Sequence, residues 1–284
     1  MTNIAFIIYR KWAFKILDLT LHSFKKKYKF ILLTSFNCEV NLKKYKYLKV
    51  YKINPKNNLY LKKILKKNKV KIALFYGWSW IIAKEIYKNF LSLCLHPSDL
   101  PKYKGGSPLQ HQIINGVKKS AVTIFKISQG IDSGPIYKKK ELSLKGDLKI
   151  ILKRISLIGS KITANLLYDY SNNNILFYKQ KKLKKFYKRR KKKDSEFKLN
   201  QIKKKNFLYF NNFIRALNHP SYPIAYFIFK NKIIFVKKVI KIKKNNKIKT
   251  INNIKKIQNK IKSNYIELKD SYAKITNGHV ANYS

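Results

Sequence analysis

The chain has 284 residues, of which 45% are hydrophobic, enough for one large domain or two modest ones. It carries 65 Lys and Arg against 12 Asp and Glu, a formal net charge of +53. No apolar run approaches the roughly 18–20 residues that span a bilayer, and the short apolar opening lacks a basic segment and a small-residue cleavage site. These features argue against a membrane span and a signal peptide. The two cysteines lack metal-ligand spacing, which favours a reduced, cytoplasmic protein.

Strand and helix patterns alternate through the first 170 residues. The expected strands are 3–9, 29–36, 47–53, 71–77, 91–97 and 120–127, and the expected helices are 11–26, 59–68, 107–116 and 148–170. This alternation predicts an α/β fold with a mostly parallel sheet. Ligands of such sheets bind beyond the carboxyl ends of the strands. Gly77, His96 and the loop 128–132 all follow predicted strands, so we expect them to converge on one crevice.

A basic run over 179–193 interrupts this pattern, because twelve of its fifteen residues are Lys, Arg or Tyr. It is typical of an exposed linker. The alternating residues after it, with turns at Pro220 and Pro223, predict a small β-rich domain that resembles a barrel. The Lys- and Asn-rich tract 243–256 is expected to be loosely ordered.

The charge has two interpretations. A polyanionic partner such as RNA or anionic lipid would be attracted by it. Alternatively, the excess of lysine reflects a mutational bias toward codons poor in G and C. Lys, Asn, Ile, Tyr and Phe have such codons, and they dominate the whole chain and not one patch. Under such a bias, residues that resist replacement are informative. Ten of the sixteen Gly and Pro residues fall between Gly77 and Pro135, so the sequence predicts the active site within 76–137.

His96 and Asp132 are the candidate chemical pair in this region. Histidine suits proton transfer near neutral pH, and a nearby carboxylate can hold its tautomer and stabilise the imidazolium. The structural alternative is a surface histidine and a turn-forming aspartate. Cys94 lies two residues before His96 on the same strand face. It could form a nucleophile pair with His96, or it could be a small buried residue of an apolar strand. Neither a metal-ligand motif nor a nucleotide-binding glycine motif is present.

The stretch "LHPSDLPKYKGGSPLQHQIINGVKKSAVTIFKISQGIDSG" (95–134) resembles the signature region of the 10-formyltetrahydrofolate-dependent formyltransferases. Segments 187–197 and 211–227 resemble the junction and opening of that family's C-terminal barrel. The resemblance implies a Rossmann-like, mostly parallel sheet domain over 1–180, a basic linker over 181–198, and a small β-barrel-like (OB-type) domain over 199–284. It implies formyl transfer from 10-formyltetrahydrofolate to a primary amine, with no metal and no membrane.

The resemblance also implies roles for individual residues. His96 matches the family histidine that stabilises the intermediate and moves the proton, and Asp132 matches the carboxylate that tunes it. Cys94 stands where the family has asparagine, and a thiol is a weak substitute for an amide donor. Asp99 replaces an apolar residue of the family loop. The folate-binding positions implied are Trp78, Ser79, Trp80, Ser98, Asp99, Leu100, Pro101, Gly106, Ser128, Gln129, Gly130 and Ile131.

Two acceptor amines remain open. The two-domain plan and the positive field favour methionyl-tRNA. The motifs "KGGSPLQHQIING" and "YGWSWII" resemble those of sugar formyltransferases and favour a nucleotide-linked amino sugar. Methionyl-tRNA is preferred over the sugar by a small margin. A third hypothesis, prompted by the missing asparagine, is a non-catalytic relative that binds RNA or a nucleotide.

Overall fold

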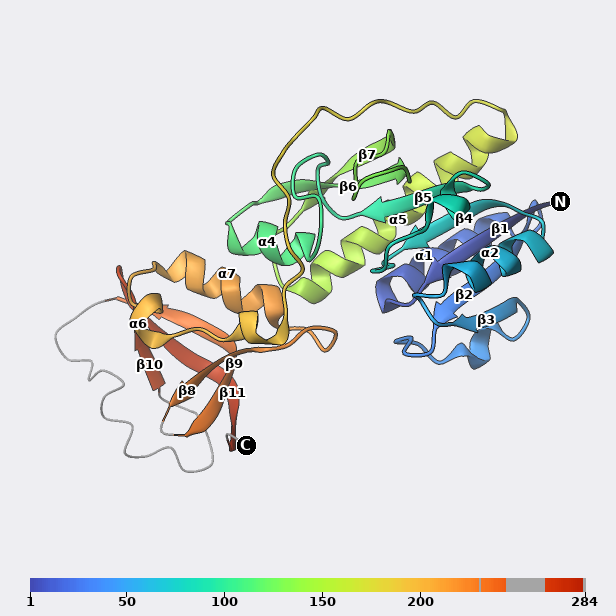
Figure 1. Ribbon diagram of the computed structural model, residues 1–284. Helices are drawn as coiled ribbons and strands as arrows, with labels where there is room; N and C mark the ends of the chain where they lie inside the picture. Colours follow the sequence, from blue (N-terminus) through green and yellow to red (C-terminus); the bar gives the residue numbers. More distant parts are fainter. Residues whose placement is uncertain (230, 244–263, 283–284) are drawn as a thin grey trace. The chain divides into compact units, whose positions relative to one another are not determined.

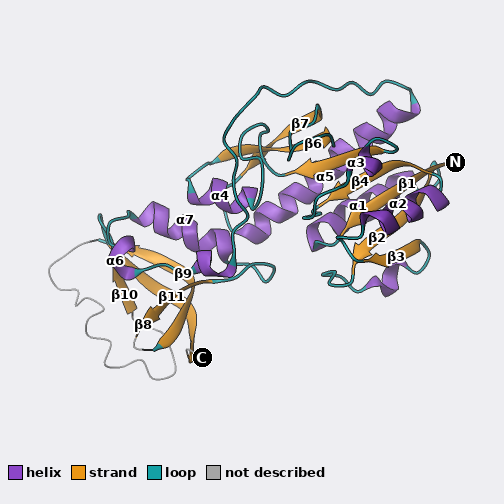
Figure 2. Ribbon diagram, viewed as in Figure 1, coloured by secondary structure: helices purple, strands orange, loops and turns teal. Residues whose placement is uncertain are grey.

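A computed structural model describes residues 1–229, 231–243 and 264–282. Most of the 243–256 tract therefore lies outside the described residues. The chain divides into two compact units, coloured by sequence in Figure 1 and by element type in Figure 2. Unit 1 comprises Met1–Pro108, Lys119–Ser143 and Leu152–Tyr187; unit 2 comprises Leu109–Lys118, Leu144–Ile151 and Lys188–Ser284. The domain limits 1–180, 181–198 and 199–284 stay a prediction.

The described part of unit 1 contains a seven-stranded sheet in the order β3-β2-β1-β4-β5-β6-β7. The strands are β1 (Thr2–Ile8), β2 (Tyr28–Ser35), β3 (Lys49–Ile53), β4 (Val70–Tyr76), β5 (Leu91–His96), β6 (Lys119–Lys126) and β7 (Ile136–Ser143). The first five strands in this order pair in parallel, while β6 and β7 join antiparallel. The predicted α/β class and mostly parallel sheet are confirmed.

Helices cover both faces of this sheet, which is why β1 and β4 are nearly continuous apolar runs. These helices are α1 (Lys11–Phe24), α2 (Asn58–Lys67), α3 (Lys84–Tyr87) and α5 (Leu148–Ser171). On one face, α2 and α3 pack against Ala5, Ile7 and Phe75. On the other face, the Tyr76 hydroxyl is 3.0 Å from Thr163 Oγ1 of α5. The expected helices 11–26, 59–68 and 148–170 are confirmed; α3 and β7 are additional.

Unit 2 combines short helices with an antiparallel sheet. Its elements are α4 (Pro108–Ile114, except its first residue), η2 (Lys192–Ser195), α6 (Leu199–Ile202), α7 (Phe207–Leu217), β8 (Ala225–Phe229), β9 (Lys232–Ile242), β10 (Asn264–Glu267) and β11 (Tyr272–Asn282). Within the described ranges the four strands form one curled antiparallel sheet in the order β10-β11-β9-β8. Phe197 packs against Phe210 and Phe227 with ring centroids 5.0 and 5.2 Å apart. The β-rich C-terminal region is thus confirmed.

Gly159 allows α5 to approach the strand that carries His96. A Cβ at Gly159 would lie 2.6 Å from Ile16 Cδ1 of α1 and 2.7 Å from Leu95 Cδ1 of β5. Side chains this close to a helix backbone leave no room for a methyl group. Gly159 therefore lets Leu95, the neighbour of His96, be fully covered.

We expect Gly159→Ala to lower the free energy of unfolding by up to about 2 kcal/mol, because overpacking costs about 1–3 kcal/mol and the gain in helix propensity returns only about 1 kcal/mol. Chemical denaturation of unit 1 measures this. Lys161→Ala, at an exposed site on the same helix, should stay within about 0.5 kcal/mol of the unchanged protein. A stabilised Gly159→Ala protein would show that the contact is loose.

Candidate active site

His96 is the last residue of β5, and its side chain is buried. Its Nε2 atom lies 3.0 Å from the carbonyl oxygen of Tyr103. A carbonyl oxygen only accepts, so Nε2 carries a hydrogen and donates it there. The other ring nitrogen, Nδ1, lies 3.5 Å from Asp132 Oδ2. The structure therefore brings together the two residues that the sequence separates by 36 positions, and it makes Nδ1 the ring nitrogen that faces the carboxylate.

The Asp132 carboxylate is held by the backbone of a second loop. Its Oδ2 atom accepts a hydrogen bond of 2.8 Å from the N–H of Gly105. Asp132 itself has a φ of 50°, in the left-handed region that aspartate tolerates better than most residues. Its side chain is 17% exposed, so water reaches the carboxylate only partly. One oxygen atom thus links the loop after β5 with the loop between β6 and β7.

The route by which Asp132 reaches His96 differs from the prediction. The sequence predicts convergence at carboxyl strand ends, but β6 runs antiparallel to β5, with His96 opposite Thr123 and Leu93 opposite Lys126. The carboxyl end of β6 is therefore beside the early part of β5, and the parallel-sheet argument fails for this loop. Its return is stabilised by Lys126 N–H, which donates to Pro135 O over 2.8 Å. The predicted convergence at carboxyl strand ends does hold for Gly77 and His96, because β4 and β5 are parallel.

The loop 98–101 is mainly a buried support for His96. Ser98 is fully buried; its hydroxyl donates to Lys102 O over 2.8 Å, and its own carbonyl accepts from Thr123 Oγ1 over 2.7 Å. Leu100 is fully buried as well, in a small cluster with Phe125, Ile136 and Cys94. Pro101 follows it, partly exposed. The side chains of Ser98 and Leu100 therefore shape the loop from within.

Asp99, which departs from the family pattern, points to solvent from this loop. Its Oδ1 is 2.8 Å from Lys139 Nζ of β7, and its Oδ2 is 3.8 Å from Lys102 Nζ. The side chain is 43% exposed. The Asp99 carboxylate forms ion pairs with two lysines, which stabilise this loop where the family has an apolar contact. These ion pairs account for how an acid is accommodated here.

Cys94 packs beside the pair but is a poor nucleophile. Burial raises the pKa of its thiol well above the usual value, and the Asp132 carboxylate raises that pKa further. The reactive form of cysteine is the thiolate, so the thiol remains protonated and unreactive near neutral pH. This geometry favours the interpretation of Cys94 as a small packed residue over that of a Cys–His nucleophile pair.

Trp78, Ser79 and Trp80 lie together after β4, next to the end of β1. The rings of Trp78 and Trp80 are 4.9 Å apart, and Trp80 is 4.9 Å from the ring of Tyr9. The Tyr9 hydroxyl is 2.8 Å from Ser79 Oγ. Gly77, with a φ of 64°, makes the turn into this cluster. The cluster offers partly exposed aromatic surface at the carboxyl edge of the parallel strands.

The second predicted folate loop, 128–131, precedes Asp132 directly. Ser128 is partly buried, whereas Gln129, Gly130 and Ile131 are exposed, with Ile131 at 50%. Gly106, the remaining predicted position, is partly buried and donates its N–H to Tyr187 O over 2.7 Å. An exposed apolar side chain and accessible backbone thus lie directly before Asp132, and the folate-binding role of these residues stays a prediction.

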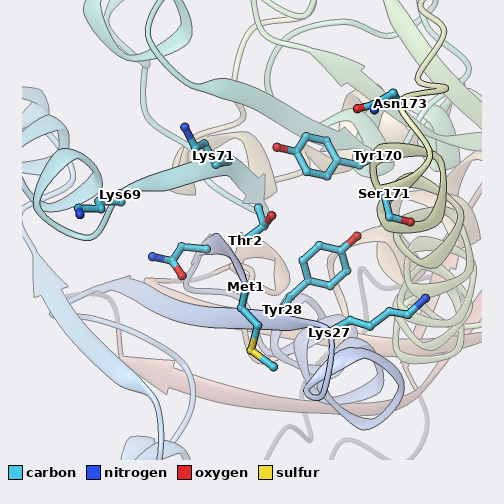
Figure 3. A pocket seen from close by; sticks show the side chains of 10 residues that line it. Met1, Thr2, Lys27, Tyr28, Lys69, Lys71, Tyr170, Ser171 and Asn173 are labelled. Atoms are coloured by element: carbon cyan, nitrogen blue, oxygen red, sulfur yellow. The ribbon is translucent and has the colours of Figure 1, made fainter.

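A cavity of about 770 Å³ lies at the opposite edge of the sheet (Figure 3). It is lined by residues at the amino ends of β1, β2 and β4 and by the end of α5, including Thr2, Tyr28, Lys71 and Tyr170. Figure 3 shows the hydroxyl of Tyr28 close to Ser171 in the last turn of α5, where it donates to Leu167 O over 2.6 Å. Because His96 ends a strand parallel to β4, this cavity is separate from the candidate active site.

Across the residues that the structure describes, no group of three or more His, Cys, Asp and Glu side chains could hold a metal ion. No helix among them is both long and apolar enough to cross a membrane.

Sequence reasoning missed the contacts that assemble the site. Tyr103, Gly105, Gln180 and Tyr187 each bond to the His96 or Asp132 loops, three of them through backbone atoms. Backbone contacts leave no side-chain signal. The Gly105–Gly106 pair was the available clue, since a Cβ at Gly105 would clash with Tyr187 O and the Phe186 ring.

The fold and the site define an α/β protein with a buried histidine beside a partly buried carboxylate and with a β-rich C-terminal unit. Residues 37–150, which include His96 and Asp132, match the family model described as "Formyl transferase". This region of the chain is therefore similar to formyl transferase domains, and the resemblance seen in the sequence is confirmed there.

Curated relatives match over the same part of the chain. Methionyl-tRNA formyltransferase of Rickettsia canadensis is 34% identical over 111 residues, covering 37% of this chain and 37% of that protein. The enzyme of that name from Rickettsia prowazekii is 38% identical over 98 residues, covering 34% and 31%. The matched segment thus spans about a third of the length of these relatives.

Solved structures match over more of the fold. Methionyl-tRNA formyltransferase from Clostridium thermocellum aligns with a TM-score of 0.66 at 27% identity, covering 84% of this chain and 93% of that one. A 4-N formyltransferase from Francisella tularensis aligns with a TM-score of 0.68 at 19% identity, covering 81% and 93%. The second likeness, at its low identity, supports the fold alone.

The Cys94–Asp132 proximity can be measured by thiol alkylation. In the unchanged protein we expect iodoacetamide to label Cys94 more slowly than an unhindered thiol at pH 8, because burial and the carboxylate raise the thiol pKa. Asp132→Asn removes the negative charge, lowers that pKa, and should shift the labelling profile to lower pH. Peptide mass spectrometry follows the reaction, with Asp99→Asn as a matched control. An unchanged profile in Asp132→Asn would place the carboxylate away from the thiol.

Proposed function

We propose that the chain transfers a formyl group from 10-formyltetrahydrofolate to the amino group of methionyl-tRNA. The observation that carries the proposal is the pairing of buried His96 with partly buried Asp132 inside the region that matches the formyl transferase family. The relatives named above as methionyl-tRNA formyltransferases support the acceptor, as do the net charge of +53 and the exposed lysines between residues 179 and 185. Such a field attracts the phosphates of an RNA.

His96 has the position required of a proton carrier. Nε2 is engaged with Tyr103 O, so Nδ1 is the nitrogen that would accept a proton from the attacking amine. Asp132 would stabilise the resulting positive ring across the 3.5 Å gap, which is long for a hydrogen bond before substrate arrives. The amine nitrogen would bond to the formyl carbon of the folate donor, the bond from that carbon to N10 would break, and the proton held by His96 would pass to N10 of the departing tetrahydrofolate. The aromatic residues Trp78 and Trp80 and the exposed loop 129–131 would hold its ring.

Stabilisation of negative charge on the formyl oxygen is the weaker part of this site. Cys94 occupies the position of the family asparagine, and its thiol, kept protonated by a raised pKa, is a weak donor. Loss of one oxyanion donor costs on the order of 10²–10³ in rate. We therefore propose a slower enzyme than one with an amide at this position.

A nucleotide-linked amino sugar is the alternative acceptor. The motif "KGGSPLQHQIING" and the aromatic cluster of Trp78 and Trp80 favour it, since aromatic rings stack on nucleobases. The third possibility, a non-catalytic binding relative, predicts folate or nucleotide binding without transfer.

A formyl-transfer assay with both acceptors distinguishes these proposals. We expect formylation of methionyl-tRNA by the full chain and its loss, by at least about 10²-fold, in His96→Ala, because the proton carrier is removed. Folate binding, followed by tryptophan fluorescence, should persist in that variant. Transfer to an amino-sugar nucleotide but not to methionyl-tRNA would show that the sugar is the acceptor. Folate binding without transfer to either acceptor would favour the non-catalytic relative.

Cys94→Asn tests whether the oxyanion geometry is intact. We expect the transfer rate to rise by at least about tenfold and at most by the roughly 10²–10³-fold that one donor contributes. The apolar cluster around Cys94 makes an unsatisfied amide costly, so denaturation must be measured in parallel. Cys94→Ser, of similar size, is the control for polarity alone. A folded Cys94→Asn protein that loses activity would show that the thiol has a role of its own.

A further inference from the structure

Residues 178–187, here called the strap, contact both loops that meet at the His96–Asp132 pair. The strap follows the end of α5 as an extended segment of unit 1 (Figure 1). It has isolated β-bridges at Tyr178 and Tyr187 and no regular structure between them. An irregular segment that returns twice to one site is held there by individual contacts.

The first contact fixes the loop that carries Asp132. The N–H of Tyr178 donates to Ile136 O over 2.8 Å, and the N–H of Ile136 donates to Tyr178 O over 2.7 Å. Two residues further, Gln180 Nε2 donates to the carbonyls of Asp132 and Gly134, at 3.0 and 2.6 Å. The side-chain amide of Gln180 thus holds the backbone on both sides of Ser133.

The second contact fixes the loop that holds the Asp132 carboxylate. The N–H of Tyr187 donates to Lys104 O over 3.0 Å, and the N–H of Gly106 donates to Tyr187 O over 2.7 Å. The rings of Tyr103 and Tyr187 stack with centroids 4.7 Å apart. Gly105, between these bonds, donates its N–H to Asp132, and Tyr103 O accepts from His96.

Gln180 differs from the other strap contacts because a side chain makes it. Its Oε1 atom is buried without a hydrogen-bond partner among the described residues, which costs free energy. The two hydrogen bonds donated by its NH₂ group offset that cost. Both bonds end on the short loop whose left-handed Asp132 points at His96. A donor with two hydrogens is what two neighbouring carbonyls require.

We propose that Gln180 is a positioning residue that sets the orientation of Asp132 toward His96 and thereby the rate of proton transfer. The proposal rests on the proposed formyl transfer for its kinetic consequence. Gln180 reaches the carboxylate through the backbone of residues 132–134, and it contacts neither His96 nor the reacting atoms in the described contacts.

The kinetic test uses two substitutions of Gln180 in the full chain. Gln180→Glu keeps the shape but removes both donors, and it should lower kcat about 10- to 100-fold with KM for donor and acceptor within about twofold. Gln180→Lys restores an N–H donor and should recover part of kcat. Equal loss in both variants, or a change confined to KM, would overturn the positioning role.

A second readout is independent of activity. The Gly105 amide is hydrogen-bonded to Asp132 Oδ2, so its hydrogen exchange, followed by NMR, reports the orientation of the carboxylate. Gln180→Glu should accelerate this exchange at least about tenfold, whereas Asn172→Asp, the same change at an exposed residue after α5, should not. If the unchanged protein transfers no formyl group, the proposed function fails, and Gly105 exchange still decides the role of Gln180. Unchanged exchange in Gln180→Glu overturns the proposal.

Discussion

The candidate site depends on one carboxylate oxygen, Asp132 Oδ2, which faces the His96 ring and accepts the N–H of Gly105. A carboxylate can serve both because it has several lone pairs and no hydrogen of its own. In this position it ties together two loops that leave the sheet on different strands. The backbone bonds of Tyr103, Lys104 and Gly106 then follow from that junction, since the loop after β5 must lie where Gly105 can reach Asp132.

The setting of Asp132 is unusual within so basic a chain. The other acids with ion pairs in the described residues mostly meet lysine or arginine, as Glu39 meets Arg10 and Asp270 meets Lys241. Asp132 instead has a histidine ring and a backbone N–H as partners. A lysine at the same distance would hold the carboxylate permanently and compete with the histidine. Partial burial keeps the interaction less screened than a surface pair would be.

Much of the fold was predictable because its signals are local. Buried parallel strands such as β1 and β4 are continuous apolar runs between turns, and α5 shows a long helical period. The His96–Asp132 pair was predictable only through the Gly- and Pro-rich region and the family motif. The antiparallel entry of β6 was not, because the apolar pattern of a strand is the same whichever way the strand runs beside its neighbour. Gln180 lies in a lysine-rich run where composition indicates a linker, so nothing in the sequence separates it from its neighbours.

The basic segment is bonded to the same two loops that meet at Asp132. A linker of lysines would by itself contribute only a diffuse attraction for phosphates, screened within about 8 Å at physiological salt. The strap, however, is bonded at Tyr178, Gln180 and Tyr187 to the loops that hold Asp132 and His96. Its exposed lysines are therefore only a few residues from bonds to the loop that carries Asp132. Under the proposed function, an anionic acceptor lying on this strap would act on the same backbone that places Asp132 beside His96, so acceptor binding and proton transfer would share one set of hydrogen bonds.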